Sequence, residues 1–250
     1  MSNDRSRWRI RILGVAIDDV IEAEALERIA AFIASGAPHH VVTINPEFVM
    51  EARHNAAFRQ VLTAADLATP DGFGLLLVAR QRGTPFRGRV TGVALTEQIA
   101  VLAARRGWSL FLLGARPGVA ERAAAALQRA HPTLRIAGCY AGSPDPIDEQ
   151  AIHERITQAH PDILLVAYGH PAQELWIARN QPHLRVPVAI GVGGVFDFLA
   201  GEVPRAPEWM RQAGIEWLYR LIKQPWRWRR ILVAVPLFLW TAMRERRSTS

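Results

Sequence analysis

Short apolar runs alternate with amphipathic stretches along most of the chain. The run Ile-Leu-Leu-Val-Ala that ends at Ala167 contains no polar residue, as is typical of a strand covered on both faces. The predicted strands are Val41–Ile44, Ser109–Leu113, Arg135–Cys139, Asp162–Ala167 and Val186–Gly191. The predicted helices are Pro46–His54, Val119–Arg129, Ile152–Gln158 and Pro171–Asn180. Strands that alternate with helices predict a compact α/β fold, Rossmann-like, with a largely parallel sheet and flanking helices.

Residues 204–250 differ in composition from the rest of the chain. They carry ten of the 30 Lys and Arg residues, three of the 23 Asp and Glu residues and five of the eight Trp residues, so the charge of +7 lies in this segment. Arginine and tryptophan together suit the interface between water and an anionic lipid surface. We therefore expect an α/β domain over residues 1–203 and a helical, basic, membrane-associating appendage over residues 204–250.

The longest apolar run, Ile231–Met243, has 13 residues and contains Pro236. A helix that spans a bilayer needs about 20 residues, so this run either lies in the membrane interface or forms a buried helix. The apolar run Ile12–Ile17 is short and ends at Asp18, which argues against a signal peptide. The single cysteine, Cys139, excludes an internal disulfide, and a reducing compartment is the simplest interpretation.

Four polar segments lie at or near predicted strand ends, where ligands collect in parallel α/β sheets. They are Thr43–Glu47, Thr69–Gly74, Gly88–Gly92 and Tyr168–Glu174. Asp71 lies in a Pro-Asp-Gly turn, where it is either an ordinary turn residue or a carboxylate that takes a proton from an attacking hydroxyl.

The other polar candidates also have two interpretations each. Thr43 and Asn45 either open a helix or donate hydrogen bonds to a sugar or phosphate. Arg89 is either a solvated surface cation or a partner of a diphosphate. Gln173 either lies in the first turn of a helix or orients a sugar hydroxyl. Gly191 and Gly193 follow a strand, and such glycines let backbone N–H groups approach a phosphate.

Other classes of protein fit less well. The glycines lack the G-x-G-x-x-G spacing of dinucleotide-binding oxidoreductases. His170 has no histidine or cysteine at metal-ligand spacing, so we expect no metal site and no cofactor. The basic residues are confined to one Trp-rich end, which disfavours a nucleic-acid-binding protein. A non-catalytic protein that binds a nucleotide sugar, or nucleic acid through its basic tail, is the alternative to an enzyme.

In order along the chain, six segments resemble the WecG/TagA/CpsF glycosyltransferases. The segments are TINPEF, ATPDGFGLL, RVTG, LFLLGARPGVAERAA, DILLVAYGHPAQELWI and GVGGVFDFLAGEVPRAPEWMRQAGIEWLYRL. Each motif alone is unspecific, but the ordered set is specific, and the resemblance runs from about residue 12 to about residue 235.

This resemblance implies transfer of a sugar from a UDP-sugar to a polyprenyl-diphosphate-linked saccharide, with inversion, a β linkage and no metal. It implies a peripheral enzyme on the cytoplasmic face of the bacterial membrane, and a homo-oligomer is compatible with it. By the family's motifs, Asp71 is the base, and Thr43, Asn45, Arg89 and Gln173 contact substrate. Arginines of the appendage are thought to close near the diphosphate. The candidates are Arg211, Arg220, Lys223 and Arg227.

Two positions depart from the family's pattern. Ala94 stands where an acidic residue is common, and Ala172 stands where lysine is frequent. Both changes fall beside presumed substrate contacts. They leave N-acetylmannosamine, its uronic acid and glucose as candidate donor sugars.

Overall fold

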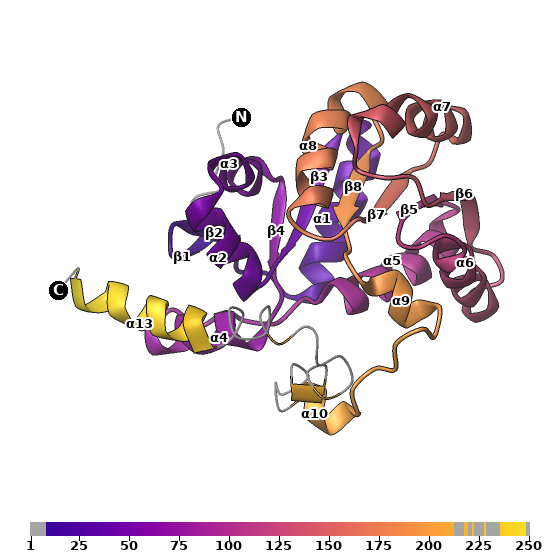
Figure 1. Ribbon diagram of the computed structural model, residues 1–250. Coiled ribbons are helices and arrows are strands. Elements are labelled where there is room, and N and C mark those ends of the chain that lie inside the picture. The colour runs from indigo at the N-terminus through magenta and orange to yellow at the C-terminus, as the bar shows by residue number, and fades with distance from the viewer. Residues whose placement is uncertain (1–8, 213–217, 220–221, 223–227, 229–235, 249–250) are drawn as a thin grey trace.

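The computed structural model describes residues 9–212, 218–219, 222, 228 and 236–248 (Figure 1). A six-stranded sheet with the order β4-β3-β8-β7-β5-β6 forms the centre, and all of its strand pairs are parallel. Its strands are β3 (His39–Ile44), β4 (Leu67–Pro70), β5 (Ser109–Gly114), β6 (Arg135–Tyr140), β7 (Ile163–Ala167) and β8 (Val188–Gly191). The α/β, Rossmann-like prediction is confirmed.

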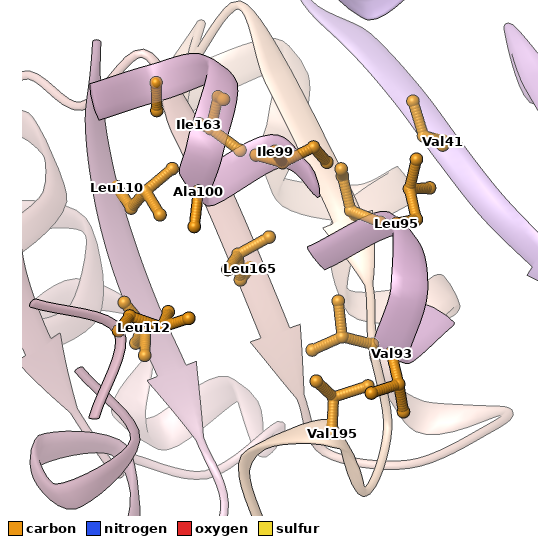
Figure 2. Packing of buried hydrophobic residues seen from close by; sticks show 14 of the residues in the cluster. Val41, Val93, Leu95, Ile99, Ala100, Leu110, Leu112, Ile163, Leu165 and Val195 are labelled. Atoms are coloured by element: carbon orange, nitrogen blue, oxygen red, sulfur yellow. The ribbon is translucent and has the colours of Figure 1, made fainter. Parts of the chain in front are cut away.

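Helices cover both faces of the sheet. One face carries α1 (Glu22–Ser35), α5 (Gly92–Arg106), α6 (Val119–Ala130) and α9 (Val195–Leu199). The other carries α2 (Pro46–His54), α3 (Ala56–Ala64), α7 (Glu149–Ala159) and α8 (Ala172–Leu184). Strand residues alternate between the two cores: Leu110 and Leu112 pack toward α5, as Figure 2 shows, and Phe111 and Leu113 pack toward α7 and α8. Both faces are therefore buried, as the apolar runs predict.

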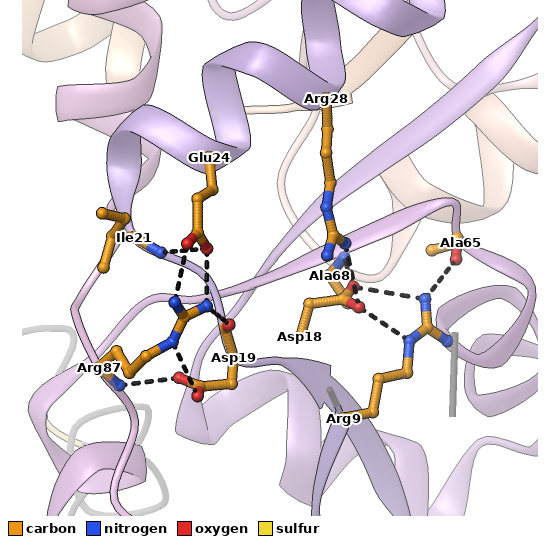
Figure 3. A network of polar contacts seen from close by, with 9 residues as sticks. All are labelled: Arg9, Asp18, Asp19, Ile21, Glu24, Arg28, Ala65, Ala68 and Arg87. Carbon is orange, nitrogen blue, oxygen red and sulfur yellow. Dashed lines mark hydrogen bonds and ion pairs between the residues drawn. The ribbon is translucent and has the colours of Figure 1, made fainter. Parts of the chain in front are cut away.

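The N-terminal segment forms a hairpin of β1 (Arg9–Ile12) and β2 (Val15–Asp18), with an antiparallel register. The buried Asp18 carboxylate accepts hydrogen bonds from the Arg9 side chain at 3.0 Å and from the Ala68 backbone at 2.7 Å (Figure 3). Arg28 of α1 pairs with the same carboxylate. This network attaches the hairpin to β4 and to α1.

A second ion-pair cluster fixes the loop that leads to α5. The Arg87 guanidinium pairs with Asp19 at 3.1 Å and with Glu24 at 2.7 Å (Figure 3). The hydrogen bond from Arg87 lowers the pKa of the Glu24 carboxyl below its ordinary value. These contacts are exposed to solvent, so we expect them to add little to the free energy of unfolding. They hold the segment that carries Arg89 beside the start of α1.

The described part of the C-terminal segment includes α10 (Glu208–Gln212) and α13 (Phe238–Ser248). Figure 1 shows α13 beside α4 (Phe73–Gln81). Phe238 and Ala242 are buried in the same apolar cluster as α2 and α4. The Arg82 guanidinium donates to the Ala242 carbonyl at 3.0 Å. Within the run Ile231–Met243, Phe238 and Ala242 therefore pack on the α/β domain. The division of the chain at residue 203 stays a prediction.

Hydropathy adds one finding about membranes. None of the helices in the described ranges combines the length and the apolar character needed to cross a bilayer.

Candidate active site

A cavity of about 320 Å³ opens at the carboxyl ends of the parallel strands. Its walls come from the segments that follow β3, β4, β5, β7 and β8 and from the start of α5. Of the sequence-predicted residues, Asp71, Thr43, Asn45, Gln173 and Gly193 line it. Residues from five separate strand ends are thus brought into one site, which is the usual position of a ligand site in an open parallel sheet.

Asp71 is held on a tight turn directly after β4. Its backbone N–H donates to the Ile44 carbonyl of the neighbouring strand at 2.7 Å. Gly72 has φ of +122°, a conformation that side-chain-bearing residues rarely adopt, so this position of the turn favours glycine. The Asp71 Oδ2 atom accepts a hydrogen bond from the Gly92 N–H at 3.1 Å, at the first residue of α5. The positive end of that helix dipole stabilises negative charge on Asp71.

Thr43 and Asn45 lie close to this carboxylate on the adjacent strand end. Asn45 is the N-cap of α2, and its Oδ1 atom accepts from the Phe48 N–H at 3.1 Å. Asn45 therefore caps the helix, as one of its two interpretations predicts. It also lines the cavity. A methyl group added at Gly92 would lie 3.5 Å from Thr43 Oγ1 and 3.9 Å from Asp71 Oδ2. Both side chains therefore lie next to Gly92, where a larger residue would contact them.

Gln173 is buried and bridges two loops of the cavity wall. Its Oε1 atom accepts from the Gly169 N–H at 3.0 Å and from the Gly193 N–H at 2.9 Å. The N–H of Gly193, predicted to approach a phosphate, is therefore bonded to Gln173. Gly191 is absent from the cavity lining within the described part of the chain. A side chain at Gly191 would collide with the Glu174 carboxylate, so packing explains this glycine.

Arg89 is not among the described cavity-lining residues. It is half-buried, and its neighbour Val90 donates to the Pro70 carbonyl at 2.9 Å, which places the Arg89 backbone beside the end of β4. Among the appendage candidates, Arg211 lies in α10, whose side chain at this position the structure does not describe. Arg220, Lys223 and Arg227 lie outside the described residues.

Two carboxylates and one histidine line the cavity beyond the residues predicted: Glu47, Asp197 and His170. His170 Nε2 lies 3.3 Å from Glu47 Oε2, and its ring lies 5.0 Å from that of Phe48. Glu47 and His170 fall inside the polar strand-end segments, so their position along the chain could have marked them as site residues. Asp197 follows the glycine-rich turn after β8, where it had no signal of its own.

The cavity also has an unusual tyrosine. Tyr168 lines it, and burial raises the pKa of its phenol above the ordinary value. Over the described ranges, no group of three or more His, Cys, Asp or Glu side chains is arranged to hold a metal ion. The lining contains the carboxylates Glu47, Asp71 and Asp197 but no lysine or arginine from the described residues.

Sequence comparison relates the chain to known proteins. A sequence model of the glycosyl transferase WecG/TagA/CpsF family matches residues 10–250. The N-acetylglucosaminyldiphosphoundecaprenol N-acetyl-β-D-mannosaminyltransferase of Bacillus subtilis (strain 168) is 32% identical over 208 residues, which cover 83% of this chain and 80% of the relative. The enzyme of the same name from Staphylococcus aureus (strain MW2) is 31% identical over 243 residues, 96% of this chain and 94% of the relative. The chain therefore belongs to the WecG/TagA/CpsF family of glycosyl transferases.

Proposed function

We propose that the protein is an inverting, metal-independent glycosyltransferase that uses a UDP-sugar donor and a polyprenyl-diphosphate-linked saccharide acceptor. The observation that carries the proposal is the position of Asp71, on a turn that opens into the cavity between Thr43 and the start of α5. The names of the relatives support the acceptor class, because they describe transfer of N-acetylmannosamine to N-acetylglucosaminyldiphosphoundecaprenol. We assign N-acetylmannosamine as the first donor to test, with its uronic acid and glucose as alternatives.

In the proposed mechanism, Asp71 takes the proton of the acceptor hydroxyl. The hydroxyl oxygen attacks the anomeric carbon from the face opposite the UDP group. The bond between that carbon and the UDP oxygen breaks, and its electron pair leaves on the diphosphate. Inversion at the anomeric carbon of an α-linked donor gives a β linkage. A positioned base of this kind contributes about 10²–10⁴-fold to the rate.

The leaving diphosphate needs positive potential. The described residues around the cavity supply the N-termini of α2 and α5, while the lining also contains His170 and three carboxylates. We therefore assign further charge to Arg89 and to the appendage residues Arg211, Arg220, Lys223 and Arg227. If the appendage closes over the cavity at an anionic membrane, full activity is confined to the surface that holds the acceptor. The proposed location is the inner face of the bacterial cytoplasmic membrane, in the synthesis of cell-surface polysaccharide.

The test is transfer from a panel of UDP-sugars to N-acetylglucosamine linked through diphosphate to a polyprenyl chain. We expect turnover with UDP-N-acetylmannosamine, activity that survives a chelator, and a β linkage in the product by NMR. Strict dependence on Mg²⁺ or Mn²⁺ would contradict the metal-independent mechanism. Binding of UDP-sugars with no transfer to any lipid-diphosphate acceptor would favour a non-catalytic nucleotide-sugar-binding protein.

A further inference from the structure

A buried polar chain runs beneath the floor of the cavity. Glu174 has no solvent exposure, and its two carboxylate oxygens have different partners. Oε2 lies 2.7 Å from His40 Nε2 on β3, and Oε1 accepts from Gln173 Nε2 at 2.9 Å. A buried carboxylate without partners is strongly destabilising, so both contacts are needed to keep it there.

This chain fixes which way the Gln173 amide faces. Glu174 Oε1 accepts its hydrogen bond from the NH₂ end of the amide, so this contact favours the observed orientation. The carbonyl end must then face the two backbone N–H groups, those of Gly169 and Gly193. If the amide were reversed, its NH₂ group would oppose two N–H donors, and the bridge between the loops would be lost.

The bridged loops form one wall of the cavity. Gly169 lies in the loop between β7 and α8, which contributes Tyr168 and His170 to the lining. Gly193 lies in the turn between β8 and α9, which contributes Val192 and Gly194 to the lining, and Val195 and Asp197 follow in α9. The bridge therefore sets the distance between two segments of the cavity wall.

We propose that Glu174 and His40 are positioning residues for the donor site: by orienting the Gln173 amide, they hold the β7–α8 and β8–α9 loops at the spacing that binds the UDP-sugar. Neither side chain lines the cavity in the described structure, so each acts through Gln173. This inference deepens the proposed function and rests on it for the identity of the donor.

The test compares three variants of the full chain. Glu174→Met keeps the volume of the side chain but removes both acceptors. It should lower kcat/KM for the UDP-sugar at least tenfold, mainly through a higher KM, with acceptor KM unchanged. Glu174→Gln can still offer one carbonyl oxygen to Gln173 and should lose less than Glu174→Met. Should Glu174→Met fail to fold, His40→Met removes the outer end of the chain and should shift the donor KM in the same direction.

Gln181→Met is the matched control. Gln181 is also a buried polar residue of α8, and its amide donates to the backbone carbonyls of His39 and Val186, away from the cavity. It should lower Tm by a similar amount and leave donor KM unchanged. Wild-type donor KM in a folded Glu174→Met protein overturns the positioning role, as does an equal rise in donor KM in Gln181→Met.

Calorimetry with UDP separates this inference from the proposed function. If the wild type binds UDP but transfers no sugar, the proposed function fails, and weaker UDP binding by Glu174→Met still supports the positioning role. Unchanged UDP binding by Glu174→Met in that case overturns it. A wild-type chain that neither binds UDP nor transfers sugar overturns both.

Discussion

The Asp71 carboxylate and the Gly92 backbone N–H form a hydrogen bond of 3.1 Å. This contact joins the Pro-Asp-Gly turn after β4 to the Arg-Val-Thr-Gly segment that begins α5. Thr91 caps the same helix, with its Oγ1 accepting from the Ala94 N–H at 3.2 Å. Ala94 is thus the third residue of α5, a position where an acidic side chain completes a capping box. A capping box would therefore give an acidic residue at this position a structural role.

Replacement of Asp71 by asparagine should abolish the base but keep the contact with Gly92, because the amide carbonyl can accept the same hydrogen bond. We expect turnover to fall by about 10²–10⁴-fold with UDP-sugar binding retained. Asp197→Asn, at another cavity carboxylate, is the control and should lose much less. A larger loss in Asp197→Asn than in Asp71→Asn would move the base to Asp197.

Arg89→Ala should weaken the binding of UDP more than that of uridine, if its guanidinium reaches the diphosphate when the donor is bound. A charge-assisted hydrogen bond of this kind contributes about 1.5–3 kcal/mol, or roughly 10–150-fold in Kd. Calorimetry with both ligands measures the difference. Arg80→Ala, at an exposed arginine of α4, is the matched control for loss of one surface charge. Equal weakening of UDP and uridine would remove Arg89 from the diphosphate site.

Phe238 packs the C-terminal helix against the start of α4, directly after the turn that carries Asp71. Its side chain is fully buried, and a methyl group at Gly74 would lie 3.5 Å from its ring. Phe238→Ala should lower the free energy of unfolding by about 3–5 kcal/mol, the usual cost of removing a buried aromatic side chain. Trp240→Ala, on the exposed side of the same helix, should cost far less. Urea denaturation of both variants measures this, and equal losses would mean that α13 does not dock through Phe238.

Cys139 should react slowly with alkylating reagents in the native protein. Burial raises the pKa of its thiol to about 11, above its value in the unfolded chain. Because the thiolate is the reactive form and a raised pKa depletes it, alkylation by iodoacetamide at pH 8 should be about a hundredfold slower in the native state than in urea. The difference should shrink as the pH rises toward 11. Equal rates in both states would contradict the burial of this thiol.

The local sequence predicted much of the fold because several boundaries depend on residues close in the chain. The helix Pro46–His54 was predicted with the bounds that the structure gives α2, since Asn45 caps it and proline suits its first residue. The helix α5 was not predicted, because the apolar residues Val101 and Leu102 lie outside its buried face and weaken the contrast in hydropathy between the two sides. The run Ile12–Ile17 belongs to a hairpin whose two strands are too short to separate by pattern.

Some features of the candidate site could also be predicted from the sequence, and others could not. Asp71, Thr43 and Asn45 lie at or just after the ends of β3 and β4, which are neighbours in the sheet, so parallel topology brings them to one edge. The positions of Gln173 and Gly191 depend on how α8 packs against β8, which the local pattern does not encode. The sequence therefore indicated that these residues belong together, but not that Gly191 makes room for Glu174 or that Gln173 bonds to the backbone.

The outer side of α13 provides a sharper test of membrane association than removal of the whole appendage. Truncation after Gly201 would also remove Phe238 and Ala242 from the core, so lost activity would not report on lipid alone. Trp240 and Met243 are 51% and 48% exposed, and the Arg244 guanidinium lies 4.1 Å from the Trp240 ring. An exposed indole beside arginine suits the lipid interface.

We expect Trp240→Ser with Met243→Ser to weaken binding to vesicles that contain anionic lipid, with little change in Tm because neither side chain is in the core. Ile147→Ser is the matched control, since the Ile147 side chain is 85% exposed and lies in the α/β domain, outside the appendage. Each cation that contacts the surface should contribute about 1 kcal/mol to the binding free energy. Salt screens this contribution, so vesicle binding should weaken as the salt concentration rises. Cosedimentation with anionic and neutral vesicles at two salt concentrations measures both effects. Wild-type binding by the double variant would place the membrane contact elsewhere, and salt-independent binding would exclude the role of the basic residues.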